Sequence, residues 1–258
     1  MLFKRTGLCL VLLLLSWHSR ADLASGVDAI ARRDYATALA IFKPLAEQGD
    51  VAAQVNLGNL YMKGLGVQQS YAAAQRWYTE AAGQNEPLAQ TKLGILYFHG
   101  LGVTQDAAEA ARWFTKAAER GETSAQAILG SLYAQGEGVP QDLAKAYYWY
   151  ALAEEQGNQE ARNGRKSLEQ ELTPGQRDEA LALLAEKRQQ RQLADEQEFE
   201  AINDAAEAGL KTESPKAEGH PETRRSRSTP NHAAESKQRK IGKTRPALRK
   251  ARPKTSLK

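Results

Sequence analysis

The stretch Leu57–Val67, LGNLYMKGLGV, decides the fold of this chain, because it recurs as LGILYFHGLGV at Leu93–Val103 and as LGSLYAQGEGV at Leu129–Val139. Successive copies are 36 residues apart, and the same step relates the tryptophans at positions 77, 113 and 149. A fixed period of this length is the sequence signature of stacked structural repeats. We therefore predict a repeat array.

Each repeat is predicted to form two helices. In the first repeat, Ala53, Leu57 and Tyr61 recur at helical spacing and give one apolar face. Gly64 and Gly66 end that helix, because glycine tolerates the left-handed backbone of a helix C-terminus. A residue that caps the second helix follows in each repeat: Ser70, Asp106 or Asp142. The second helix carries the tryptophan, which we expect to fill the space between neighbouring helices.

The chain divides into an array and two flanking regions. The predicted parts are a signal peptide (1–21), a half repeat (26–50), full repeats (51–86, 87–122 and 123–157), a helical extension (158–210) and a tail (211–258). The run Thr173-Pro174-Gly175-Gln176 has the form of a capping box and starts a helix within the extension. The tail is rich in Pro, Ser, Lys and Arg and has no period, so we predict that it is disordered.

Residues 1–21 have the three parts of a signal peptide: Lys4 and Arg5, an apolar run over 8–15, and small residues at 19 and 21. We expect cleavage after Ala21, with an uncleaved anchor as the alternative, although the apolar run is short for a bilayer span. The one cysteine, Cys9, lies in this run, so the mature chain would have no disulfide or cysteine-held metal. The expected location is the periplasm of a Gram-negative bacterium, or beyond it.

Charge is distributed unevenly along the chain. Residues 211–258 contain fifteen Lys and Arg and four Asp and Glu, a net charge of +11, whereas residues 22–210 carry a net charge of −10. A tail of this charge binds anionic surfaces with little selectivity. The candidate tail contacts are Arg224, Arg225, Arg227, Lys237, Arg239, Lys240, Arg249, Lys250 and Arg252. The alternative is a solubilising extension without a partner.

The recurring strings, each followed by an A-x-x-W-[YF] helix, resemble Sel1-like repeats, relatives of the tetratricopeptide repeat. The third repeat departs slightly, with Glu137 in place of Leu65 and Leu101. The resemblance implies an all-α fold: a right-handed α-solenoid of helix pairs. It also implies an adaptor role in bacteria, often after export and often in envelope assembly, motility or host contact.

Catalysis is poorly supported by the residues present. The histidines stand at positions 18, 99, 220 and 232, so His99 alone falls in the array. We see no His/Cys/Asp/Glu cluster with metal-ligand spacing and no acid–base pair, and we expect no cofactor. The Gly-x-Gly pairs follow helices rather than strands, which favours turns over phosphate loops. We predict that the chain is not an enzyme.

Binding is the favoured function. On the first helix of each repeat, the side opposite the core face combines apolar and polar residues, and in tetratricopeptide-like stacks this side lines a concave groove. The predicted groove residues are Val55, Asn59, Met62, Thr91, Ile95, Phe98, Ala127 and Ser131. An apolar strip of this kind suits a bound peptide. The alternative is that these residues contact the adjacent repeat.

We therefore predict an exported adaptor that binds a protein or peptide in this groove, with the tail tethering it to anionic envelope components. One alternative is an envelope accessory or regulator that acts mainly through its tail on wall polymer or anionic lipid. Another is a cytoplasmic nucleic-acid-associated protein. The signal peptide argues against the latter, and no aromatic residue follows Phe199 to stack on bases, so we do not expect nucleic acid as a partner.

Overall fold

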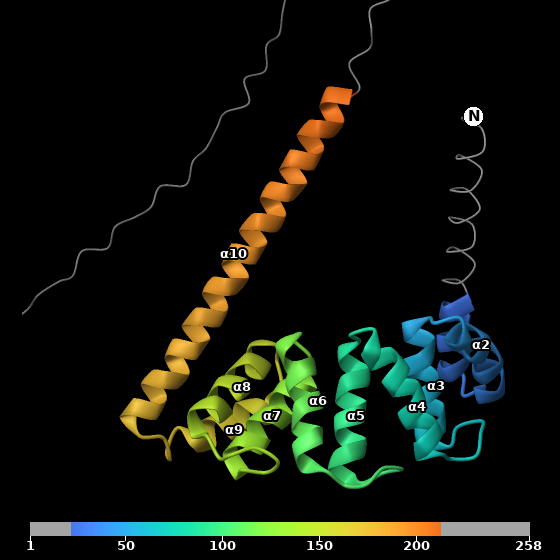
Figure 1. Cartoon of the computed structure of the whole chain (residues 1–258), viewed down its shortest axis with the longest axis horizontal. Coiled ribbons are helices and arrows are strands. Elements are labelled where there is room, and N and C mark those ends of the chain that lie inside the picture. The colour runs from blue at the N-terminus through green and yellow to red at the C-terminus, as the bar shows by residue number, and fades with distance from the viewer. Residues whose placement is uncertain (1–21, 213–258) are drawn as a thin grey trace, which may run out of the picture. The chain divides into compact units, whose positions relative to one another are not determined.

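Helices make up most of the described chain, which is residues 22–212 of a computed structural model, with side chains described through residue 205. Residues 22–31 are helical, and no strand occurs in the described range. The helices that follow are α2 (Tyr35–Glu47), α3 (Val51–Lys63), α4 (Tyr71–Gly83), α5 (Pro87–His99), α6 (Ala107–Glu119), α7 (Thr123–Gln135), α8 (Leu143–Glu155), α9 (Gln159–Leu168) and α10 (Pro174–Thr212). From α2 to α9, each helix packs against the next in a row (Figure 1). The predicted α-solenoid of helix pairs is confirmed.

Local chemistry sets the helix ends where the period predicted them. A left-handed glycine closes the first helix of each full repeat: Gly64, Gly100 and Gly136, with φ of 66°, 67° and 71°. At the start of α4, the side chain of Ser70 accepts a hydrogen bond from the backbone N–H of Ala73 at 3.2 Å. Asp106 and Asp142 cap α6 and α8 in the same way. These caps satisfy N–H groups that a helix leaves without a partner.

A glycine in each first helix allows an aromatic ring of the second helix to approach its backbone. A Cβ on Gly58 would lie 2.5 Å from Cε1 of Tyr78, and one on Gly94 would lie 2.6 Å from Cε1 of Phe114. The ring that fills this space therefore belongs to the residue after the tryptophan. Trp77 itself is only half-buried, so its expected role in filling the core needs correction.

A buried glutamine in each first helix connects neighbouring helices. In the first full repeat, Nε2 of Gln54 donates to the backbone carbonyl of Ala46 at 3.2 Å, and its Oε1 accepts from Nε2 of Gln84 at 3.0 Å. In the third repeat, Oε1 of Gln126 accepts from Nε2 of Gln156 at 2.7 Å. Each hydrogen bond satisfies a polar group that would otherwise be costly to bury.

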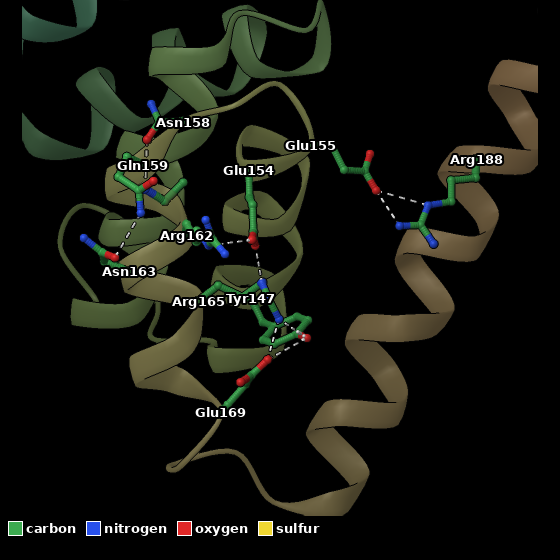
Figure 2. Close-up of polar contacts among 11 residues, drawn as sticks. Tyr147, Glu154, Glu155, Asn158, Gln159, Arg162, Asn163, Arg165, Glu169 and Arg188 are labelled. Atoms are coloured by element: carbon green, nitrogen blue, oxygen red, sulfur yellow. Dashed lines mark hydrogen bonds and ion pairs between the residues drawn. The ribbon is translucent and has the colours of Figure 1, made fainter.

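The last repeat is covered by α9 and by the first part of α10. Arg165 of α9 forms hydrogen bonds with Glu154, Glu169 and the hydroxyl of Tyr147 (Figure 2). These contacts fix α9 to α8. The apolar contribution of α10 is made by Ala180 and Leu184, which are buried in the same cluster as the last repeat, whereas Phe199 is 65% exposed.

The predictions for both termini, namely the signal peptide at 1–21 and the tail contacts from Arg224 to Arg252, concern residues outside the described range. Helix α10 includes Lys211 and Thr212, which the sequence analysis assigned to the tail. Within the described range, no helix has the length and apolar character needed to span a bilayer.

Candidate functional site

A pocket of about 460 Å³ opens on the side of the array formed by the first helices. Its walls come from the last two full repeats and from the helix that follows them, because Phe98 belongs to α5, Ile128 and Ser131 to α7, and Glu160 to α9. Tyr150 of α8 also lines it. The pocket combines apolar and aromatic side chains with a few polar groups, as binding sites for ligands do.

The pocket brings together predicted groove residues from neighbouring repeats. Phe98, Ala127 and Ser131 line it, and all three are half-buried, so part of each side chain faces solvent. Ile95 is half-buried as well and packs against the same apolar cluster as Phe98. We call the side of the first helices on which these positions and their equivalents in the other repeats lie the groove.

Val55 and Thr91 do not reach this surface. Val55 is 6% exposed and lies in an apolar cluster with residues of the following repeat. Thr91 is 2% exposed, and its hydroxyl donates to the carbonyl of Pro87 at 2.9 Å and lies 3.2 Å from a carboxylate oxygen of Glu122. Val55 therefore packs toward the following repeat and Thr91 contacts the residue that caps α7, which agrees with the alternative left open for this set.

Asn59 and Met62 lie at the other end of the groove. The hydroxyl of Tyr78 donates to Oδ1 of Asn59 at 2.8 Å and lies 3.5 Å from the sulfur of Met62. Burial raises the pKa of Tyr78, so this hydroxyl stays protonated and remains a donor. Asn59 also lines a smaller pocket of about 250 Å³ with Lys63 and Lys92.

Sequence reasoning missed the contribution of α9 to the groove. Asn158, Glu160 and Ala161 line the larger pocket, and they follow Glu122, Ser124 and Ala125 by one period. That step was a usable signal, because Ala161 and Gly157 continue the alanine and glycine positions of the preceding repeats. The helix after the third repeat therefore acts as one further first helix.

The two ends of the groove differ in charge. Lys63 and Lys92 line the smaller pocket near the start of the array, whereas Glu137 and Glu160 line the larger one near its end. No group of His, Cys, Asp and Glu able to hold a metal occurs among residues 22–212, and His99 is exposed. The groove therefore combines an apolar pocket with a basic end and an acidic end.

Comparisons with known proteins agree with the predicted repeats. A family model described as Sel1 repeat matches residues 25–50, 51–86, 87–122 and 123–158, which is about half of the chain. No curated protein sequence matches the chain significantly.

Two solved structures give the same result. The chain is 42% identical to a protective antigen present in uropathogenic Escherichia coli strains, with a TM-score of 0.52 over 54% of this chain and 31% of that one. It is 34% identical to a Sel1 repeat protein from Oxalobacter formigenes, with a TM-score of 0.52 over 54% of this chain and 57% of that one. The Helicobacter pylori cysteine rich protein B is 21% identical, with a TM-score of 0.37 over 55% of this chain and 95% of that one. The chain thus spans under two thirds of the length of the first two.

Proposed function

Because the chain belongs to the Sel1 repeat family, whose members generally serve as non-enzymatic scaffolds in protein–protein interactions, we propose that its groove binds a peptide segment of a partner protein. The observation that carries this proposal is the pocket of about 460 Å³ at the junction of α5, α7 and α9. An aromatic or long aliphatic side chain fits between Phe98, Ile128 and Tyr150.

The charges along the groove favour certain charges in the bound segment of the partner. Lys63 and Lys92 at one end favour acidic residues in the partner, and Glu137 and Glu160 at the other favour basic ones. The bound segment would therefore carry an apolar anchor close to its basic part and a separate acidic part. Charges at the rim of an interface mainly set register and association rate, so the anchor supplies most of the affinity.

Export and tethering belong to the same proposal. The signal-peptide pattern of residues 1–21 supports export, and a net charge of +11 over residues 211–258 supports contact with anionic envelope components. The relative from uropathogenic E. coli is described as a protective antigen, which is compatible with display outside the cytoplasm.

The test is a crosslinking pull-down from intact bacterial cells with the tagged chain and two variants. Phe98→Asp places a charge in the pocket, so we expect capture of the partner to fall at least tenfold while helicity is unchanged. Leu181→Asp is the matched control, because Leu181 is an exposed apolar residue on α10, away from the groove, and we expect capture to persist.

Mass spectrometry of the captured chain completes the test. Asp22 as the new N-terminus is the result expected for export. A partner captured equally well by the wild type and by Phe98→Asp would overturn the groove proposal. A retained Met1 together with nucleic acid in the captured material would overturn export.

A further inference from the structure

The second helices carry a set of equivalent surface sites, each built around a tryptophan. One pocket, of about 750 Å³, is lined by Gln54, Trp77 and Gln84. A pocket of about 550 Å³ is lined by Gln90, Trp113 and Arg120, each 36 residues later. We call these the Trp77 site and the Trp113 site. They are formed mainly by α4 and α6, whereas the groove is formed by the first helices.

The third equivalent tryptophan, Trp149, lies beside a helix of the same chain, α10. Trp149 is 9% exposed, and the pocket beside it is lined by Leu183 and Lys187 of α10. Arg188 of α10 also forms a hydrogen-bonded ion pair with Glu155 of α8 (Figure 2). An amphipathic helix is therefore the natural occupant of this kind of site, held by an apolar residue and by opposite charges.

The Trp113 site has unused hydrogen-bonding capacity. Among residues 22–205, the buried side-chain polar atoms without a hydrogen-bond partner are Oε1 of Gln90 and Nε1 of Trp113, and both residues line this site. Gln90 lacks a donor because the residue at the end of this repeat differs. Arg120 stands where Gln84 and Gln156 stand in the other repeats. Nη2 of Arg120 donates to Oδ1 of Asn85 at 2.9 Å instead, so Gln90 receives no amide donor.

The Trp77 and Trp113 sites also differ in charge. Lys116 lies over the Trp113 ring with Nζ 4.1 Å from the ring centroid, and Arg120 stands on the rim beside it, with Glu119 as the one acidic residue lining that pocket. At the Trp77 site, the lining residues include Glu47, Glu80 and Arg76. The Trp113 site thus favours an acidic occupant and the Trp77 site does not.

A matching segment exists within this chain. Residues 192–204 of α10 contain five acidic residues and no Lys or Arg. Phe199 and Ile202, which are three apart on this helix, are 65% and 59% exposed. Side chains three apart lie on the same side of a helix, so this segment is an acidic helix with an apolar edge.

We infer that the Trp113 site binds the acidic segment of α10 (residues 192–204) from a second copy of the chain. Phe199 or Ile202 packs beside Trp113, as Leu183 does beside Trp149 within one chain. The acidic residues around them pair with Lys116 and Arg120. The chain is then a self-associating adaptor, with its groove left open for the partner of the proposed function.

Sedimentation equilibrium of the purified chain at low and high salt tests this inference. We expect concentration-dependent association that weakens as salt rises, because the pairing charges are exposed. Trp113→Ala and Phe199→Asp are each expected to weaken association at least tenfold. Trp77→Ala is the matched control and is expected to leave association unchanged, since the Trp77 site has the wrong charge.

Three further variants separate loss of contact from loss of folding and from binding by the tail. Arg120→Gln supplies the missing donor to Gln90 and removes a positive charge, so we expect a more stable chain that associates less. Lys116→Glu in one copy and Glu200→Lys in the other should each weaken self-association, and mixing them should restore association. A chain that stays monomeric at millimolar concentration would overturn the inference, as would equal losses with Trp77→Ala and Trp113→Ala, or charge-reversed copies that fail to associate when mixed.

Discussion

The substitution Arg120→Gln should stabilise the fold, because it completes a hydrogen bond that the other full repeats already have. In those repeats, a glutamine amide donates to the buried glutamine oxygen, at 3.0 Å for Gln54 and 2.7 Å for Gln126. In the second repeat, Oε1 of Gln90 is buried without a donor, because Arg120 points to Asn85. A glutamine at position 120 has the length and the amide group to reach Gln90.

The size of the effect follows from the groups involved. A buried acceptor without a partner costs about 1–3 kcal/mol, and a new neutral hydrogen bond contributes about 1 kcal/mol net. The lost hydrogen bond between Arg120 and Asn85 is exposed and is worth about 0.5 kcal/mol. We expect the free energy of unfolding to rise by about 1–2 kcal/mol, which corresponds to about 2–8 °C in Tm for a chain of this size.

Urea unfolding followed by circular dichroism measures this change. The reverse substitution, Gln156→Arg, removes a donor that exists in the structure, so it should lower stability by a similar amount. The m-value should be the same in all three chains, since the surface exposed on unfolding does not change. An Arg120→Gln chain no more stable than the wild type, together with an unaffected Gln156→Arg chain, would refute the reasoning.

Two further predictions concern backbone fit and pH. A Cβ on Gly138 (φ 71°) would lie 2.1 Å from the carbonyl oxygen of Ala107, so Gly138→Ala should cost more than about 2 kcal/mol in urea unfolding, whereas Gly121→Ala (φ 88°, open space) should cost about 1 kcal/mol. The hydrogen bond from Arg165 lowers the pKa of Glu154 below its ordinary 4.5, so this pair adds stability above that pH that is lost as the pH falls through the lowered pKa. As the pH falls from neutral to below 4.5, Glu154→Gln should therefore lose less stability than the wild type, and equal losses would show that the pair contributes nothing.

The 36-residue period was enough to predict the helix pairs and their ends. The glycines that close α3, α5 and α7 and the caps of α4, α6 and α8 depend only on local backbone chemistry, which sequence encodes directly. Contacts between repeats are harder to predict from the sequence of a single repeat. Val55 and Thr91 are examples. Angular spacing on a single helix places them outside the core, although Val55 lies in a cluster with the next repeat and Thr91 contacts the carboxylate that caps α7.

The tryptophans show the same limit. A recurring aromatic residue on an apolar stripe suggests core packing, yet Tyr78 and Phe114 occupy the space over the glycines and leave Trp77 and Trp113 half-buried. Trp149 is buried, and α10 lies beside it. That contact depends on how a segment some thirty residues later in the chain folds back, which a local pattern does not record.

The unpaired oxygen of Gln90 has a mechanical consequence. In a linear stack, each repeat is held by its own stability and by contact with its neighbours. The repeat formed by α5 and α6 lacks the buried glutamine–glutamine hydrogen bond that the repeats on either side possess, so we expect it to open first under a pulling force. When both ends of the chain are pulled, we expect the packing of this repeat to open first. The two halves of the array would then turn relative to each other while each half keeps its own packing.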